Sequence, residues 1–260
     1  MSGPVLSVSG VSKSFGGLKA VQDFTLSLRP GDLQGLIGPN GAGKTTCFNL
    51  LTGVYAPDQG AIKLAGTSVV GMRPSRIALT GMARTFQNIR LFGDLTVLDN
   101  VRVGGHLRVG HTMGGAIFRT RRSRLEEAAL SRRAFELLDF FGLTDRADVR
   151  ARNLPYGDQR KLEIARALAT DPKVLLLDEP AAGMNSGEKI ALRDLIRLVR
   201  DRFRVTILLI EHDMGLVMDI CERITVLDYG CIIAEGTPRE IQANPKVIEA
   251  YLGTAEESHA

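Results

Sequence analysis

The spacing of apolar residues changes along the chain, and each change predicts a different kind of element. Residues 5–11 and 21–28 alternate between apolar and polar positions, which predicts two half-buried strands. Two further short stretches, 61–64 and 67–70, flank Ala65 and Gly66, which predict a tight turn. The first third of the chain therefore predicts a small antiparallel sheet.

The middle of the chain has mostly helical spacing. Apolar residues recur along 130–141, which predicts an amphipathic helix closed by Gly142. Residues 104–123 are rich in glycine and arginine and predict a loop or insertion. Other segments predict helices at 76–80, from 96 and at 156–169, and a strand at 82–86. We expect a helical subdomain over residues 88–158.

The last third alternates apolar runs with helical stretches. The runs 173–178, 205–210 and 224–227 predict buried strands, and the segments 187–201 and 213–221 between them predict helices. Strands alternating with helices predict a parallel sheet covered on both faces. A capping box at Thr237, followed by proline, begins a last helical region that we expect to end near residue 252.

Composition narrows the class of protein. The 260 residues are 44% hydrophobic and 24% charged, which is ordinary for a globular chain, and the net charge of +4 is too small to argue for nucleic acid. No apolar run approaches the length of a membrane span, and no signal peptide is visible. Cys47, Cys221 and Cys231 lack metal-binding spacing and are typical of reduced cysteines in the cytosol.

One glycine-rich stretch predicts a phosphate-binding loop. It lies between the apolar run 33–37 and a helical stretch from Thr45 to Leu51, and it fits G-x-x-x-x-G-K-[ST]: Gly38, Pro39, Asn40, Gly41, Ala42, Gly43, Lys44, Thr45 and Thr46. Glycines let successive N–H groups turn toward phosphate oxygens at a helix N-terminus. Lys44 supplies a cation for the β- and γ-phosphates and Thr45 a hydroxyl for Mg²⁺. The motif predicts a bound nucleoside triphosphate and does not by itself name a function.

Polar residues at the ends of predicted strands are candidates for the chemistry. Asp178 ends a buried strand and is placed to hold Mg²⁺ through water, while Glu179 is a candidate base for an attacking water. The alternative is a solvent-facing acidic pair. His212 follows the next strand and is expected near the same phosphates, although an isolated histidine is more often structural. Gln87 follows the strand 82–86, where its amide can bind Mg²⁺ or position water.

The segment Asn153 to Arg160 adds the decisive pattern. Residues 154–160 read Leu-Pro-Tyr-Gly-Asp-Gln-Arg, and residues 174–180 read Val-Leu-Leu-Leu-Asp-Glu-Pro. With these two stretches and the phosphate-binding loop, the chain resembles the ATP-binding subunit of an ABC transporter. The resemblance covers nearly the whole sequence. It implies one ATP-binding domain with a RecA-like P-loop NTPase fold: a parallel-sheet core, an antiparallel β subdomain and an α-helical subdomain. The core and β subdomain would take residues 1–87 and 159–260, and the helical subdomain 88–158, with the insertion 104–123.

The resemblance also assigns roles by position. Phe15 would stack on adenine, residues 38–46 would be the Walker A motif, and 174–179 Walker B. Gln87 and His212 would be the Q-loop and H-loop residues, and the D-loop would be 181–185. The signature segment, which faces the ATP of a partner subunit, would comprise Leu154, Pro155, Tyr156, Gly157 and Asp158.

The signature segment departs from the Leu-Ser-Gly-Gly-Gln of the broad family. Pro155 lacks both the serine hydroxyl and an N–H, although proline suits a first helical turn. An acid at Asp158 is unfavourable near phosphate unless its side chain turns aside to cap the helix.

Finer details resemble the branched-chain amino acid importers, and the insertion resembles the longer of their two ATPase subunits. These details lie at residues 85–92, 154–166, 181–185, 235–238 and 250–253. ATPases of urea and lipopolysaccharide transport share parts of the pattern, and a soluble ABC ATPase outside transport is the other class. The resemblance implies ATP hydrolysis with Mg²⁺, a homo- or heterodimer of ATPase subunits, two membrane permeases, an extracytoplasmic solute-binding protein and a peripheral place on the cytoplasmic face of the inner membrane.

Two surface features carry weaker interpretations. The family docks its membrane subunit just after Gln87, where Leu91, Phe92, Leu95 and Val97 either line that groove or form the subdomain core. The basic run Arg119, Arg121, Arg122 and Arg124 is typical of a solvated face, with contact to anionic lipid as the less favoured alternative.

Overall fold

The computed structural model describes residues 3–107 and 121–257, with the side chains of 3–107 and 125–251. The chain divides into two compact units, residues 1–84 with 173–260 and residues 85–172. The helical subdomain expected from the sequence stopped at residue 158. The second unit instead extends to residue 172, because helix α6 (Tyr156–Leu168) crosses residue 158 and packs on the other helices of this unit.

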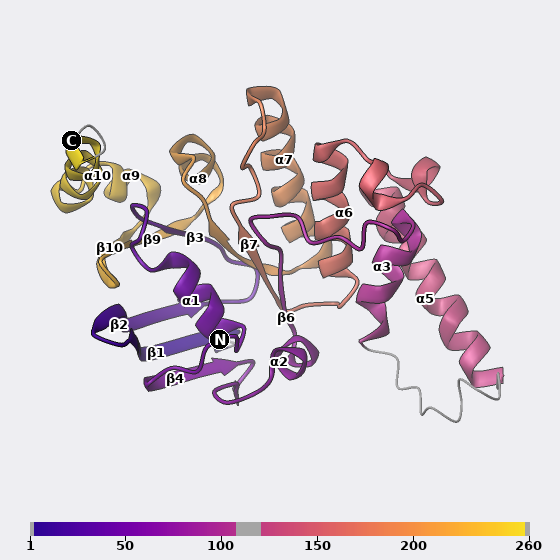
Figure 1. Cartoon of the computed structure of the whole chain (residues 1–260), viewed down its shortest axis with the longest axis horizontal. Helices are drawn as coiled ribbons and strands as arrows, with labels where there is room; N and C mark the ends of the chain where they lie inside the picture. Colours follow the sequence, from indigo (N-terminus) through magenta and orange to yellow (C-terminus); the bar gives the residue numbers. More distant parts are fainter. Residues whose placement is uncertain (1–2, 108–120, 258–260) are drawn as a thin grey trace. The chain divides into compact units, whose positions relative to one another are not determined.

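The first unit contains a six-stranded sheet in the order β10-β9-β3-β8-β7-β6 (Figure 1). Its strands are β3 (Leu33–Ile37), β6 (Met82–Arg84), β7 (Val174–Asp178), β8 (Thr206–Ile210), β9 (Arg223–Asp228) and β10 (Cys231–Gly236). All neighbours are parallel except β9 and β10. The parallel sheet predicted from the sequence is confirmed. The edge strand β10 was not predicted, because its residues are only partly buried and show no clear alternation.

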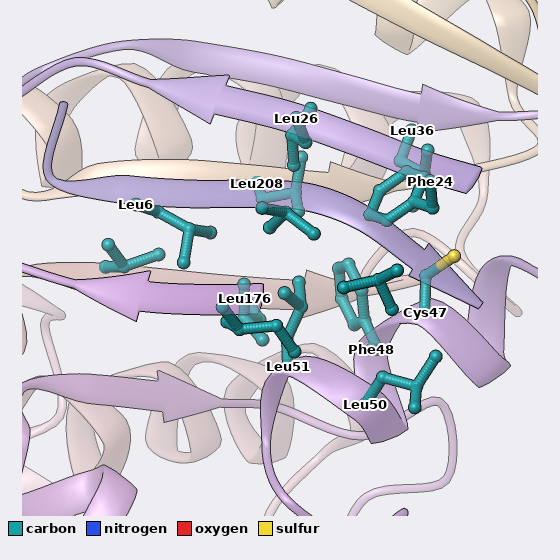
Figure 2. Packing of buried hydrophobic residues seen from close by; sticks show 14 of the residues in the cluster. Leu6, Phe24, Leu26, Leu36, Cys47, Phe48, Leu50, Leu51, Leu176 and Leu208 are labelled. Carbon is teal, nitrogen blue, oxygen red and sulfur yellow. The ribbon is translucent and has the colours of Figure 1, made fainter. Parts of the chain in front are cut away.

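A second sheet of the same unit is antiparallel, as the alternating pattern predicted. Its order is β2-β1-β4-β5, with strands β1 (Leu6–Phe15), β2 (Leu18–Leu28), β4 (Gln59–Leu64) and β5 (Thr67–Ser68). The two sheets and helix α1 (Lys44–Leu51) enclose one hydrophobic core (Figure 2). Phe24 and Leu26 come from the antiparallel sheet, Leu176 and Leu208 from the six-stranded sheet, and Phe48 from α1. This packing fixes the helix behind the phosphate-binding loop.

In the described residues of the first unit there are five other helices. They are α2 (Pro74–Thr80), α7 (Ser186–Phe203), α8 (Met214–Ile220), α9 (Pro238–Gln242) and α10 (Pro245–Glu257). Thr237 and Glu240 form the predicted capping box of α9, and Asn185 forms a second one at α7. The apolar spacing of the sequence places Ile190, Leu195, Ile196 and Val199 on one face of α7. Ile196 and Val199 are buried as expected, but Ile190 is 54% exposed and Leu192 is buried in its place.

The second unit is helical. Helices α3 (Val97–His106), α5 (Arg121–Phe140) and α6 pack on one another, and short 3₁₀ turns at Thr144–Arg146 and Ala151–Asn153 connect α5 to α6. The expected loop 104–123 was too wide, since α3 runs to His106 and α5 begins at Arg121. Residues 108–120, including Arg119, lie outside the described residues, as do the side chains of Arg121, Arg122 and Arg124. Within the parts described, no helix is long and apolar enough to span a bilayer.

Candidate functional site

The phosphate-binding loop connects the end of β3 to the start of α1, as predicted. Two of its glycines are required by close approach. Gly38 has φ +149°, and a Cβ there would meet the carbonyl oxygen of Leu227 at 2.0 Å. Gly43 has φ +101°, and a Cβ there would lie 2.5 Å from the Ala20 oxygen. The loop therefore fits only because these two positions lack a side chain.

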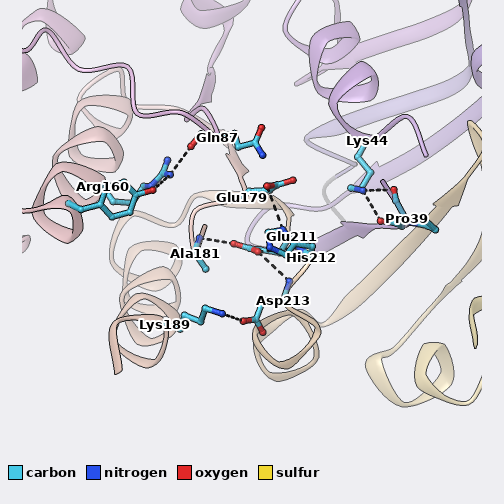
Figure 3. Close-up of polar contacts among 12 residues, drawn as sticks. Pro39, Lys44, Gln87, Arg160, Glu179, Ala181, Lys189, Glu211, His212 and Asp213 are labelled. Carbon is cyan, nitrogen blue, oxygen red and sulfur yellow. Dashed lines mark hydrogen bonds and ion pairs between the residues drawn. The ribbon is translucent and has the colours of Figure 1, made fainter. Parts of the chain in front are cut away.

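Lys44 is folded back into this loop. Its ammonium donates hydrogen bonds to the carbonyl oxygens of Gly38 (2.7 Å) and Pro39 (2.8 Å), and the side chain is buried (Figure 3). Burial lowers the pKa of Lys44, and the nearby carboxylates Glu179 and Asp178 oppose that shift. The cation is thus positioned inside the loop where phosphate oxygens would bind.

Asp178 ends β7 and forms a buried ion pair that the sequence did not predict. The guanidinium of Arg84 donates to Asp178 Oδ2 at 2.6 Å and to Asn49 Oδ1 at 2.7 Å. Arg84 ends β6, the parallel neighbour of β7, so both side chains leave the same edge of the sheet. The ion pair joins the last residue of β7 to the C-terminal half of α1. Little in the sequence indicates it, because Arg84 lies inside the predicted strand 82–86.

Glu179 follows Asp178 in a left-handed conformation with φ +46°, which is costly for a residue other than glycine. Its N–H donates to the Ile210 oxygen at 2.9 Å, where β7 and β8 end side by side. Its carboxylate lies 3.5 Å from His212 Nδ1, and the imidazole itself is largely exposed. The end of β8 thus brings His212 beside Glu179.

Glu211 is a functional-site residue that the sequence analysis missed. Its side chain is fully buried and accepts hydrogen bonds from the N–H groups of Ala181 (2.7 Å), His212 (3.2 Å) and Asp213 (3.5 Å) (Figure 3). Burial raises its pKa, while these N–H groups and His212 oppose the shift. The carboxylate therefore ties the segment after Glu179 to the segment carrying His212.

Phe15 lies at the end of β1 with its ring 41% exposed. Tyr55, which was not predicted, packs edge-on against it with ring centroids 5.0 Å apart. The ammonium of Lys13 lies 5.7 Å from the Phe15 ring and pairs with Asp58 at 2.6 Å. An exposed aromatic face braced from the side is suited to stacking on a planar base.

The remaining predicted residues belong to the second unit. The carbonyl oxygen of Gln87 accepts a hydrogen bond from Arg160. Pro155 is the N-cap of α6 and, as expected from its ring, leaves the first turn intact. Asp158 was expected to cap the helix if it turned aside, but its carboxylate instead pairs with Arg146 and, at 3.0 Å, with Lys161. Two cations thus offset the acid that replaces glutamine in the signature segment.

Family models match two parts of the chain. Residues 21–182 match the model described as ABC transporter, a span that includes the phosphate-binding loop, Gln87, the signature segment and Asp178–Glu179. The chain belongs to the ABC transporter family. A second model, described as branched-chain amino acid ATP-binding cassette transporter, matches residues 231–257 of this ABC protein.

Curated relatives are similar over almost their full length. The ABC protein is 48% identical over 255 residues to the high-affinity branched-chain amino acid transport ATP-binding protein LivG of Escherichia coli (strain K12), covering 98% of this chain and 100% of LivG. It is 46% identical over 255 residues to the corresponding BraF protein of Pseudomonas aeruginosa, with the same coverage. These similarities confirm the prediction of an ATP-binding ABC subunit that hydrolyses ATP.

Solved structures agree on the fold. The ADP conformation of an ATP-binding cassette of an ABC transporter superposes with a TM-score of 0.82 at 30% identity, covering 97% of this chain and all of that one. A nucleotide-free ATP-binding cassette gives 0.80 at 31% identity, covering 95% and 98%. The predicted P-loop NTPase fold is confirmed.

Proposed function

We propose that this ABC ATPase is the ATP-hydrolysing motor subunit of an importer for branched-chain amino acids. The observation that carries the proposal is the near-complete coverage at 48% identity to LivG, joined to the separate match of residues 231–257 to the branched-chain model. The C-terminal match matters because it lies outside the segment matched by the general family model.

The catalytic step is assigned to residues at the ends of β7 and β8. Glu179 accepts a proton from the attacking water. The oxygen of that water bonds to the γ-phosphorus of ATP, and the bond from this phosphorus to the β-γ bridging oxygen breaks. His212 holds the Glu179 carboxylate and contacts the γ-phosphate. Lys44 and the N–H groups of residues 38–46 would bind the phosphates, and the Gln87 amide would bind Mg²⁺ or position the attacking water.

Mg²⁺ fits the donors at this site. Thr45 is an exposed residue in the first turn of α1, and hydroxyl and carboxylate oxygens suit a hard ion that retains several waters. Because the Asp178 carboxylate already pairs with Arg84, it would hold the ion through water. The ion, when bound, would neutralise charge on the β- and γ-phosphates. Thr45 and Gln87 are the proposed direct ligands, and Asp178 would act on the ion through water.

Two ATP molecules would be shared between two ATPase subunits. Each phosphate-binding loop would face residues 154–158 of the other subunit, so each site would be complete only in the dimer. Asp158 would face that interface with its charge offset by Arg146 and Lys161. Hydrolysis removes the γ-phosphate contacts and lets the dimer open.

Two permeases would receive this motion, with a solute-binding protein outside the membrane, and the ATPase would lie on the cytoplasmic face of the inner membrane. Phe92 and Leu95 are exposed and suited to contact a permease, whereas Val97 is fully buried and belongs to the core. The side-chain amide of Asn100 fixes the segment 92–96. Its oxygen accepts from the N–H of Phe92, and its NH₂ group donates to the carbonyl oxygens of Phe92 and Thr96. A rigid loop that presents apolar side chains is favourable for docking.

Phe15→Ala is expected to raise the ATP KM about 5- to 30-fold, because stacking on one base contributes about 1–2 kcal/mol. The turnover number should stay near wild type, since the ring touches the base and not the phosphates. Leu18→Ala is the matched control, because Leu18 pairs with Phe15 across the turn and is more exposed. Steady-state ATPase assays measure both constants. An unchanged KM in Phe15→Ala would place the adenine elsewhere.

Purification from membranes tests the transport assignment. The affinity-tagged chain, extracted in mild detergent, is expected to recover two integral membrane proteins in stoichiometric amounts. Phe92→Ser with Leu95→Ser should lose them and keep ATP binding. Recovery of the chain without any membrane protein would count against a transporter motor and favour an ABC ATPase outside transport.

A further inference from the structure

A buried ion pair in α6 has no part in the mechanism above. Arg160 and Glu163 lie one helical turn apart, with Arg160 Nη1 3.0 Å from Glu163 Oε2. Their side chains are 0% and 1% exposed, and Arg160 is among the largest fully buried side chains. Burying two charges is costly unless further hydrogen bonds compensate. The groups that make those hydrogen bonds therefore show which part of the structure the pair holds in place.

Those partners lie in the loop after β6. Arg160 Nη1 donates to the Phe86 oxygen at 2.7 Å, and Nη2 donates to the Gln87 oxygen at 2.8 Å (Figure 3). The same Nη2 donates to the Tyr156 hydroxyl at 3.0 Å, in the first turn of α6. One planar guanidinium thus joins two consecutive carbonyl groups of the loop to the start of the helix.

Glu163 holds the other side of the same loop. Its Oε1 accepts the N–H groups of Phe86 and Arg90, both at 3.3 Å. The Arg90 guanidinium lies over the Phe86 ring, 4.4 Å from its centroid, which closes the loop on itself. The pair therefore holds both backbone polar groups of Phe86 and fixes the loop at residues 86, 87 and 90.

We propose that Arg160 and Glu163 are positioning residues that make the loop 86–90 and the first turns of α6 one mechanical unit. The proposal rests on the proposed function, in which Gln87 serves the ATP of its own subunit and residues 154–158 serve the ATP of the partner. The pair then passes the movement of Gln87 on ATP binding to the signature segment. ATP binding in one subunit would thereby change the signature segment that this subunit presents to the ATP of its partner.

Replacing both residues isolates this role from folding. A single change would leave an unpaired buried charge and would confound the result with instability. Arg160→Met with Glu163→Met removes both charges and the hydrogen bonds to the loop, and a buried pair is often replaced by apolar residues without loss of stability. The matched control is Arg133→Met with Glu136→Met, an exposed pair with the same spacing on α5 of the same unit.

Amide hydrogen exchange with and without MgATP is the test. All chains carry Glu179→Gln to block hydrolysis and are kept dilute, with light scattering used to verify the monomer. In the parent and the control, MgATP is expected to slow exchange about threefold or more both at residues 86–90 and at 154–158. In the double methionine variant, the slowing should persist at 86–90 and disappear at 154–158.

The outcomes separate the two proposals. If the parent responds in both segments and the double methionine variant responds equally, the relay through Arg160 and Glu163 is overturned. If the parent shows no response at 86–90, the assignment of Gln87 to the ATP site fails, and the relay falls with it. If the control Arg133→Met with Glu136→Met also loses the slowed exchange at 154–158, the loss does not depend on the buried pair, and the relay is overturned.

Discussion

Glu179→Gln is expected to bind ATP with near wild-type affinity and to hydrolyse it about 100- to 1,000-fold more slowly. The amide has nearly the same shape as the carboxylate, but it cannot accept the proton of the attacking water. The left-handed backbone at Glu179 and its bond to the Ile210 oxygen should be unaffected, since neither depends on the carboxylate. Single-turnover hydrolysis, with nucleotide binding measured separately, gives the two quantities.

Glu235→Gln is the control for this variant. Its carboxylate pairs with Arg223 on the β9–β10 hairpin and is exposed. That change should leave turnover at the wild-type level. Wild-type turnover in Glu179→Gln would remove Glu179 from the role of base and direct attention to Glu211, a buried carboxylate that follows β8.

Gly38→Ala is expected to abolish measurable ATP binding and to destabilise the fold by about 2–4 kcal/mol. The new Cβ would lie 2.0 Å from the Leu227 oxygen, so either the loop or strand β9 must move. Because Lys44 bonds the Gly38 oxygen, a shift of the loop also displaces the ammonium. Urea unfolding and nucleotide titration measure the two losses.

Gly41→Ala in the same loop separates backbone strain from close approach. Gly41 has φ +81°, but no heavy atom lies within 4 Å of a Cβ built there. We expect a cost of only about 1–2 kcal/mol and ATP binding that is weakened but measurable. Equal behaviour of the two alanine variants would show that strain alone sets the requirement for glycine at residue 38.

The sequence predicted most of the first unit because its signals are local. Continuous apolar runs become β3, β7 and β8, and the glycine-rich motif fixes the loop between β3 and α1. Asp178, Glu179 and His212 were proposed as site residues because strand ends in a parallel sheet share one edge, and the structure places them at that edge. The half-exposed edge strand β10 lacks such a signal and was missed.

The residues that hold the site together were not predictable. Arg84, Glu211, Arg160 and Glu163 are buried and charged, and sequence spacing alone would place charged residues at the surface. Each of them also bonds a group that is distant in the sequence, and no periodic pattern reveals those contacts. The pairing of Asp158 with Arg146 depends in the same way on the 3₁₀ turn Thr144–Arg146 between α5 and α6.

Uptake of labelled leucine, isoleucine and valine by cells of the source organism is the most direct test of the motor assignment. Deleting the gene should abolish high-affinity uptake of these amino acids, the wild-type gene should restore it, and the gene carrying Glu179→Gln should not. Urea uptake should be unchanged throughout. Normal uptake of the three amino acids in the deletion strain, or full restoration by Glu179→Gln, would contradict the assignment.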